Sequence, residues 1–484
     1  PMRPFASAIL GLCALSLLAQ APAEPKKPAK PRFEFGIPDQ PFTSDVARLI
    51  REIGDHPQVV TNLEVLCDDI GPRLTGSERL RQADHWAVDK FKAYGAVNVH
   101  EEAYDFGPSW TRGRDWGRLL NLNGQELHLA AMAWSPATKG VVKGELMVLQ
   151  GQTLDELKAQ VPATAGKIVL MGTMPKPDPK MDRRAFYRGL MGLRKEMKAT
   201  AVLLGSGRPD DLLNMTGSPV SRWGKTTVPT AFLSGEQADM LERLVARGEH
   251  PQVELQIGGT LSEKPVQAHN VVAEIKGSEW PDQVVIVGGH LDSWDLGTGA
   301  TDNGTGAMAS MEVLRAIQAL GLKPKRTLRV ILFSGEEEGL LGSKAYAKAH
   351  AAEAANWQAV LIDDMGTGRI LGWPDMGQEI WRAPLAEAMA PANNLGCQEI
   401  GAFVQPGDTD HWPFFQLGVP AFAAIQDPVD YMKITHHSQA DTFTHVVPAD
   451  LIQGAQAMAA TAWEFLNSPE RVPHIKPAEK EDAH

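Results

Sequence analysis

Acidic and histidine side chains directly follow three apolar runs of this sequence. Carboxylates that lie close together repel one another unless a cation offsets their charge or their pKa values rise. A mixture of histidine and carboxylate without thiolate is typical of sites for borderline or hard divalent metals, zinc above all. The groups are His290 and Asp292 after residues 284–287, Glu336 to Glu338 after residues 328–333, and Asp363 and Asp364 after residues 360–362.

The elements expected around these side chains belong to an α/β fold. From residue 269 onward, short apolar runs alternate with helical patterns, which favours a mixed, mainly parallel sheet with helices on both faces. Sites in such folds collect at the carboxyl ends of strands, so three successive strands are expected to deliver ionisable groups to one sheet edge. Strands are expected at 270–275, 284–287, 328–333, 360–362 and 421–425, and helices at 305–320, 342–351 and 448–466.

Each of these groups also has an ordinary structural interpretation when it is taken alone. Three adjacent glutamates usually form a solvated turn, and Asp364 alone is compatible with a helix cap. His436 and His437 alone are typical of a surface pair or of packed histidines. The ordered placement of the groups at successive strand ends favours a shared site over these separate interpretations.

The glycine-rich stretch GGHLDSWDLGTGATDNGTG, residues 288–306, raises the alternative of a nucleotide-binding loop. Asp302 stands where a GxGxxG fingerprint has its third glycine, and no Lys-Ser or Lys-Thr pair ends a P-loop. The stretch also carries His290, Asp292 and Asp295, which a phosphate would not recruit. The glycines therefore fit a tight backbone turn beside a metal better than a phosphate cradle, and Asp295 receives no role.

The composition limits the partners and the compartment of the protein. The chain has 484 residues and a formal net charge of −12, which argues against nucleic acid or an anionic membrane. Arg3 and the apolar residues 5–18 are typical of a signal peptide cleaved after Ala23, and no later run is long enough to span a membrane. The mature chain is therefore expected to be exported, periplasmic or extracellular. Cys67 and Cys397 would remain, as one disulfide or as two buried thiols.

Residues 121–262 differ in sequence pattern from the rest of the chain. Short β-rich runs are separated there by long connections rich in proline, glycine and charge, and no acidic or histidine cluster of interest falls among them. This pattern predicts an inserted domain whose two ends lie close together. Strands are expected at 143–149, 167–171, 201–204 and 253–257, and helices at 184–198 and 234–246.

Five motifs in order resemble those of the co-catalytic di-zinc exopeptidases (peptidase clan MH), a family of secreted aminopeptidases and glutamate carboxypeptidase. The motifs are HLDSWD, GATDNGTG, FSGEEEG, DDMG and THHSQADT. The resemblance covers nearly the whole mature chain, including DDIGPRLTGS near its start, and implies the zinc exopeptidase fold with a β-rich, protease-associated-like insert. The implied layout is signal peptide 1–23, flexible lead-in 24–43, peptidase domain 44–120 and 263–468, insert 121–262, and tail 469–484.

The resemblance also implies two zinc ions per chain that share one bridging carboxylate. The implied ligands are His290 and Asp364 for one ion, Glu337 and His437 for the other, and Asp302 for both. Glu336 is the implied general base, which takes a proton from water and passes it to the leaving amine. Four further site residues are implied. Asp292 would orient His290, and His436 stands where relatives place a group that polarises the scissile carbonyl. Asp410 and His411 would lie near the substrate pocket.

The implied activity is that of an exported metalloexopeptidase that removes single residues from short peptides or dipeptides. The motifs favour the carboxypeptidase branch of the family, with an aminopeptidase as the alternative. A glutaminyl cyclase and a receptor-type relative without catalysis are two further alternatives, and the presence of all five ligand positions counts against the receptor. A homodimer is implied by the resemblance alone.

Overall fold

The computed structural model describes residues 44–172, 183–220, 224, 226–404 and 407–476. The predicted signal peptide, 1–23, and lead-in, 24–43, lie outside the described residues, as does the end of the tail, 477–484. Within the described part of the chain, no helix combines the length and the apolarity needed to cross a bilayer.

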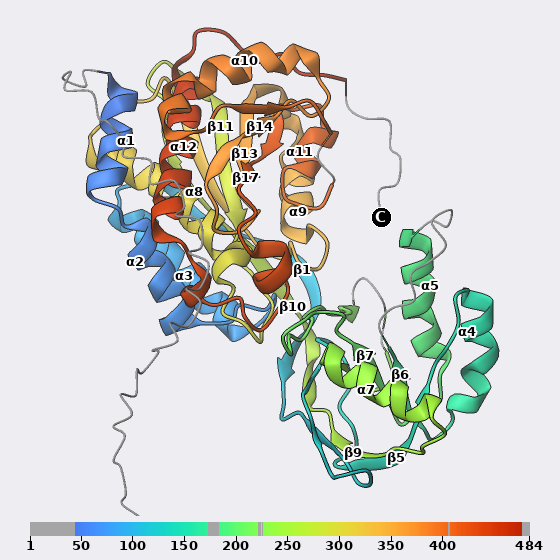
Figure 1. Cartoon of the computed structure of the whole chain (residues 1–484). Helices are drawn as coiled ribbons and strands as arrows, with labels where there is room; N and C mark the ends of the chain where they lie inside the picture. Colours follow the sequence, from blue (N-terminus) through green and yellow to red (C-terminus); the bar gives the residue numbers. More distant parts are fainter. Residues whose placement is uncertain (1–43, 173–182, 221–223, 225, 405–406, 477–484) are drawn as a thin grey trace, which may run out of the picture. The chain divides into compact units, whose positions relative to one another are not determined.

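Six strands of the described residues form a sheet in the order β1-β10-β12-β11-β13-β16. Figure 1 labels four of them, β1, β10, β11 and β13. The last four strands of that order run parallel to one another, whereas β10 pairs antiparallel with both β12 and β1. The predicted mixed, mainly parallel sheet is confirmed. The strands are β1 (Val97–Arg112), β10 (Gly259–Ile275), β11 (Trp280–His290), β12 (Arg326–Phe333), β13 (Trp357–Ile362) and β16 (Ala421–Ala423).

Helices cover both faces of this sheet, which is why its strands read as continuous apolar runs. A Cβ at Gly289 would meet α8, whereas a Cβ at the preceding Gly288 would meet Phe333 on the opposite face. Phe333 packs against Tyr346 of α9 and Phe414 of α11. The helices of the domain are α1 (Asp45–Asp55), α2 (Val59–Glu64), α3 (Glu78–Ala93), α8 (Thr305–Ala319), α9 (Leu341–Ala349), α10 (Glu379–Met389), α11 (Trp412–Gln416) and α12 (Pro448–Asn467).

One predicted strand is divided in the structure. The run 421–425 was expected to be a single strand, but β16 ends at Ala423. The next two residues, β17 (Ile425–Gln426), pair instead with β14 (Ile370–Pro374) in a small separate sheet that also contains β15 (Glu399–Gly401). The prediction of one continuous strand is therefore wrong, because the chain changes sheets at Ala424.

A second sheet is built from residues between β1 and β10. The long ladder between these two strands ends at the pair Arg112 and Gly259, so the chain leaves and re-enters the first sheet at neighbouring residues. The predicted boundaries 121–262 remain a prediction. The strands, in the order β3-β2-β9-β5-β6-β7-β8-β4, are β3 (Glu126–Leu127), β2 (Trp116–Leu119), β9 (Gln252–Gln256), β5 (Val142–Val148), β6 (Ile168–Met171), β7 (Ala201–Gly205), β8 (Thr230–Leu233) and β4 (Leu129–Ala131), with helices α4 (Leu154–Gln160), α5 (Arg183–Glu196) and α7 (Gly235–Ala246).

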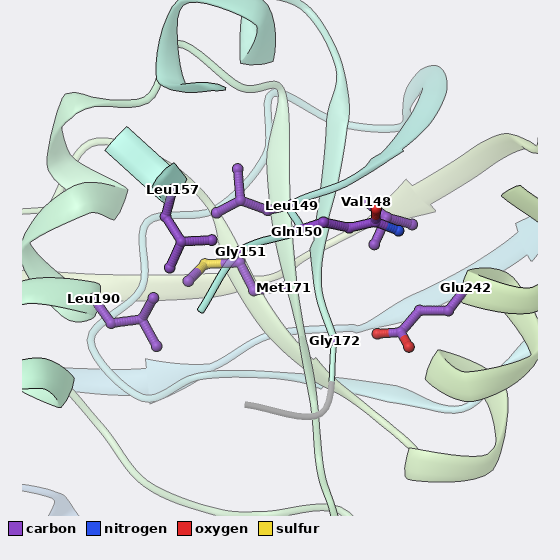
Figure 2. A pocket seen from close by; sticks show the side chains of 9 residues that line it. All are labelled: Val148, Leu149, Gln150, Gly151, Leu157, Met171, Gly172, Leu190 and Glu242. Carbon is purple, nitrogen blue, oxygen red and sulfur yellow. The ribbon is translucent and has the colours of Figure 1, made fainter. Parts of the chain in front are cut away.

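A cavity of about 200 Å³ lies among the elements of this second sheet. Figure 2 shows leucine and methionine side chains gathered on one side of it and the carboxylate of Glu242 on the other. None of the ionisable residues singled out in the sequence lines it, so it is not the predicted site.

The two cysteines expected in the mature chain are buried and unpaired. Burial raises the pKa of Cys67 to about 11 and that of Cys397 to about 12, so both are thiols at neutral pH. In this structure the alternative of two buried thiols therefore holds, and not the disulfide.

Candidate metal centre

The ends of three parallel strands meet at one edge of the six-stranded sheet. In the register of the ladders, His290 of β11 lies beside Phe333, the last residue of β12, and Gly288 lies beside Ile362, the last residue of β13. The residues that follow these strands, Glu336 to Glu338 and Asp364, therefore emerge next to His290. The side chains of His290, of these three glutamates and of Asp364 are all at least nine-tenths buried.

The glycine-rich stretch 288–306 is held by a buried arginine from the N-terminal part of the chain. Arg73 is fully buried, and its guanidinium donates to four backbone carbonyls, those of Gly71, Leu291, Thr298 and Gly299. A Cβ at Gly306 would lie 2.0 Å from the carbonyl oxygen of Asp363, so only glycine permits this approach. The glycines thus bring the backbone of the stretch close to the end of β13.

Asp441 fixes the backbone at the centre of the same stretch. Its carboxylate accepts from the backbone N–H of Thr301 at 2.7 Å, from the hydroxyl of Thr301 at 2.8 Å and from the N–H of Asp302 at 3.1 Å. Burial raises the pKa of Asp441 to about 7, and the charge of Asp302 adds to the rise, although these hydrogen bonds oppose it. Asp441 thereby holds the backbone from which the side chain of Asp302 extends.

Asp302 faces two different sets of side chains with its two oxygens. Its Oδ1 lies 3.3 Å from Nε2 of His290, and Nε2 of His290 lies 3.2 Å from Oδ1 of Asp364. Its Oδ2 lies 3.5 Å from Nε2 of His437, and Nε2 of His437 lies 3.0 Å from Oε2 of Glu337. One carboxylate therefore joins two clusters of nitrogen and oxygen atoms.

These atoms fit a pair of metal ions. Ligand atoms about 2.0–2.1 Å from a tetrahedral zinc ion lie about 3.4 Å from one another, which is near the spacings found here and longer than most hydrogen bonds. Four buried atoms of the cluster also have no hydrogen-bond partner among the described residues, namely Nε2 of His290, Oδ2 of Asp302, Oε1 of Glu337 and Oδ1 of Asp364. Buried polar atoms are rarely left unsatisfied without a reason such as an ion.

Glu336 lies beside the cluster with its carboxylate 3.8 Å from Nε2 of His290. Burial raises the pKa of Glu336 well above its usual value, His290 opposes the rise, and Asp364, Glu337 and Asp410 increase it. A buried carboxyl group beside these ligand atoms is placed for an acid–base role.

Asp292 supports the turn that carries the glutamates. Its two carboxylate oxygens accept from the N–H groups of Glu336 and Glu337, each at 3.4 Å, and from the hydroxyl of Thr75 at 2.9 Å. The Nδ1 atom of His290 lies 3.5 Å from the Asp292 carboxylate and 3.0 Å from the Asp292 backbone carbonyl. Asp292 thus orients His290 mainly through its backbone, and its side chain serves the glutamate turn.

His437 is the most accessible of the predicted ligands and belongs to a row of rings. Its side chain is 25% exposed, and its ring stacks on that of His436 at 3.8 Å and meets Trp294 edge-on at 6.0 Å. The ring of His436 in turn meets Tyr431 at 5.0 Å. A nitrogen of His436 also lies near those of His437 and the carboxylate of Asp302, so His436 belongs to one of the two groups able to hold an ion.

Asp410 and His411 are fully buried. Burial raises the pKa of Asp410 to about 7, and the charges of Asp364 and Asp292 add to the rise while His290 opposes it. Burial lowers the pKa of His411 to about 3, so this imidazole is neutral, and neither ring nitrogen has a hydrogen-bond partner among the described residues. Asp410 therefore shares the electrostatic environment of the cluster, whereas His411 packs beside Trp412.

Several residues that hold the site were not assigned a role from the sequence. Arg73 and Asp441 appear there only as letters of the motifs DDIGPRLTGS and THHSQADT. Most of their contacts lie far away along the chain, such as that of Arg73 with Leu291, 218 residues away, and that of Asp441 with Thr301, 140 residues away. Asp295, which had no role, forms a two-bond ion pair with Arg112 at the end of β1, at 2.7 and 2.8 Å. The motif resemblance was the available signal for the first two, and no sequence signal pointed to the third.

Comparison with known proteins gives consistent similarities over nearly the whole chain. A model of peptidase family M28 matches residues 270–462. Carboxypeptidase Q from Bos taurus is 32% identical over 455 residues, which cover 90% of this chain and 94% of the relative. Leucine aminopeptidase 2 from Trichophyton rubrum is 28% identical over 446 residues, covering 85% of this chain and 83% of the relative.

A solved structure extends the similarity to three dimensions. The crystal structure of a peptidase M28 precursor from Shewanella amazonensis SB2B matches with a TM-score of 0.76 and 29% identity, covering 89% of this chain and 98% of that one. The resemblance read from the motifs is confirmed, as is the closer likeness to carboxypeptidase Q that HLDSWD and HHSQADT indicate.

Proposed function

Because this chain belongs to peptidase family M28, we propose that its buried cluster is a two-zinc centre that hydrolyses the terminal bond of short peptides or dipeptides. As a member of that family the chain is a hydrolase of the metallopeptidase class. The observation that carries the two-ion proposal is Asp302, whose two oxygens face two separate sets of ligand atoms.

In this proposal His290 and Asp364 would hold one ion, Glu337 and His437 would hold the other, and Asp302 would bind both. The chemistry of the donors supports zinc, because imidazole and carboxylate without thiolate suit it. A pair of zinc ions bound there would activate a water and polarise the scissile carbonyl.

Glu336 is the proposed general base. Its carboxylate accepts the proton of the attacking water and later gives it to the nitrogen of the leaving amine. The Asp292 side chain holds the turn that carries Glu336, through the N–H groups of Glu336 and Glu337. Since this part of the site is at least nine-tenths buried, its hydrogen bonds and charges act with little screening by water.

His436 is proposed to lie against the substrate carbonyl. Its ring is held between those of His437 and Tyr431, and burial lowers the pKa of His436 to about 4, an effect that the charge of His437 increases. The imidazole is therefore neutral at pH 7 and presents one N–H donor, which can stabilise a developing oxyanion without competing for the carboxylates.

The proposed activity is that of a carboxypeptidase or dipeptidase similar to carboxypeptidase Q, and an aminopeptidase is the second candidate. The similarity to a leucine aminopeptidase along most of the chain is the observation that keeps the second candidate. A dipeptide panel with either terminus blocked separates them, since a carboxypeptidase rejects a C-terminal amide and an aminopeptidase rejects an N-acetyl group.

We also propose export after removal of residues 1–23 and a homodimer, neither of which rests on the site. N-terminal sequencing of the secreted protein tests the first, and a signal segment retained on the mature protein would contradict it. Light scattering tests the second, and a monomer mass at micromolar concentration would contradict it.

The test of the mechanism is the variant Glu336→Gln. Glutamine keeps the shape of the side chain but cannot take a proton, so we expect bound zinc to be unchanged and kcat to fall by about 100-fold or more. Zinc content and dipeptide hydrolysis are measured on the same preparation. Near-normal turnover in the zinc-loaded variant would remove Glu336 from the mechanism.

A further inference from the structure

His437 differs from the other proposed ligands in how its backbone is held. It lies in residues 436–441, the ligand loop, between η6 (Tyr431–Thr435) and η7 (Phe443–His445). Its φ is +51°, in the left-handed region that residues with a Cβ occupy only at a cost in free energy. Such a conformation persists only where surrounding contacts hold it, so the contacts of the ligand loop matter for the position of His437.

The ligand loop pairs with residues 211–215, the anchoring segment, which lies between β7 and β8 of the second sheet. The N–H of Met215 donates to the backbone carbonyl of His437 at 2.8 Å. Asn214 and Ser438 form an isolated antiparallel β-bridge. The backbone of the proposed ligand is therefore held by a short β-pairing with the second sheet's part of the chain.

Gln439 adds two side-chain bonds across the same contact. Its Oε1 accepts from the N–H of Leu213 at 2.7 Å, and its Nε2 donates to the carbonyl of Asp211 at 3.2 Å. These partners lie 226 and 228 residues earlier in the chain. One amide thus joins the anchoring segment to the ligand loop, next to His437.

The anchoring segment is itself fixed to the second sheet. Met215 is 4% exposed and belongs to the apolar core of that sheet. Directly after the segment, Ala133 donates to the carbonyl of Thr216 at 3.2 Å and accepts from the N–H of Ser218 at 3.1 Å. The backbone of His437 is thus connected to a packed core through a small number of bonds.

The ligands proposed for the first ion are held in another way. His290 is the last residue of β11, and Asp364 follows β13, both in the six-stranded sheet. The shared ligand Asp302 is held through its backbone by Asp441. In the part of the chain that the structure describes, none of these three ligands has a hydrogen bond to residues 211–215.

We propose that the anchoring segment positions His437 and thereby sets the affinity for the second zinc ion, the one that Glu337 and His437 would hold, separately from the first. This inference rests on the proposed two-zinc centre and adds a regulation of its second ion by the second sheet's part of the chain. Bonds that already place His437 in the metal-free protein reduce the ordering that accompanies zinc binding. When they are lost, the ligand loop must be ordered as the ion binds, and the affinity falls.

The test replaces Gln439 and leaves every proposed ligand unchanged. Gln439→Leu removes both side-chain bonds, whereas Gln439→Glu keeps an acceptor for Leu213 and loses the donor to Asp211. Zinc is added stepwise to the metal-free full mature chain in competition with a chelator of known affinity. We expect the dissociation constant of the second ion to rise about 10-fold or more in Gln439→Leu and less in Gln439→Glu. The dissociation constant of the first ion should change less than about 2-fold.

Gln237→Leu is the matched control. Gln237 makes the same pair of bonds inside the second sheet's part of the chain, since it accepts from the N–H of His128 at 2.7 Å and donates to the carbonyl of Glu126 at 2.9 Å. The variant loses the same chemistry away from the ligand loop, so both dissociation constants should stay within about 2-fold of the unaltered protein.

A second background shows whether the effect passes through His437. The variant His437→Ala should retain the first ion, and adding Gln439→Leu to it should change the remaining dissociation constant less than about 2-fold. In the chain that keeps His437, peptidase activity of Gln439→Leu should need about 10-fold more free zinc than that of the unaltered enzyme, because activity follows occupancy of the second site.

A first ion weakened as much as the second in Gln439→Leu, an unchanged second ion, or an equal effect of Gln237→Leu would overturn the proposal. An unaltered protein that binds one zinc ion would overturn it together with the two-zinc centre. If two ions bind but no short peptide is cleaved, the peptidase function fails, and the two dissociation constants still decide the role of the anchoring segment.

Discussion

Replacing Asp441 with asparagine tests how metal affinity depends on a side chain that is not itself an expected ligand. The carboxylate accepts three hydrogen bonds from Thr301 and Asp302, at 2.7, 2.8 and 3.1 Å. Asparagine keeps one oxygen and turns its NH2 group toward a remaining donor, so one buried donor loses its partner. Such a loss costs about 1–3 kcal/mol, which corresponds to about 5- to 150-fold in an equilibrium constant.

The lost bond lets Asp302 leave its position in the metal-free protein, and binding must restore it. We therefore expect the zinc dissociation constant of Asp441→Asn to rise about 10- to 100-fold, the usual effect of groups that support ligands. The assay is competition with a chelator of known affinity on the metal-free protein. Asp375→Asn is the control, since Asp375 is equally buried and pairs with Arg382 and the N–H of Gly377. An affinity within about 2-fold of the unaltered protein in Asp441→Asn would refute the reasoning.

Two further predictions concern stability. Arg73→Met leaves four backbone carbonyls without their donor, so the free energy of unfolding in urea should fall by about 4 kcal/mol. The control Arg79→Met frees only the carbonyl of Ile70 and should lower that free energy by about 1 kcal/mol. Equal effects of the two variants would contradict this prediction. Burial lowers the pKa of His350, but Glu353 and Glu102 raise it above its usual value. This stabilisation is complete below the unfolded pKa of about 6.5 and is lost as pH rises through the folded pKa, so His350→Gln should lower Tm more at about pH 5.5 than at about pH 8.5.

Part of the site could be predicted from the sequence, because sites in α/β folds collect at the carboxyl ends of parallel strands. His290, Glu336 and Asp364 each follow an apolar run, and parallel strands must end at the same edge, so their meeting follows from local pattern and one rule of topology. His437 does not follow a predicted strand. Its place beside Asp302 was expected only through the motif resemblance.

The supporting contacts could not be derived in this way. Arg73 reaches carbonyls more than 200 residues away, and Asp441 binds a backbone 140 residues earlier, so no spacing in the sequence encodes either contact. The contact of the second sheet's part of the chain with the ligand loop likewise depends on backbone bonds such as that from Met215 to His437. The division of the run 421–425 between two sheets likewise depends on partners that the run itself does not specify.

The most direct test of the central claim is the number of zinc ions per chain, measured by elemental analysis alongside peptidase activity during stepwise addition of zinc to metal-free protein. The two sets of ligand atoms around Asp302 predict two ions per chain, with full activity only at the second equivalent. His437→Ala should retain about one ion, since it leaves His290, Asp302 and Asp364 intact. One zinc ion per chain with full activity in the unaltered protein would contradict the two-ion centre.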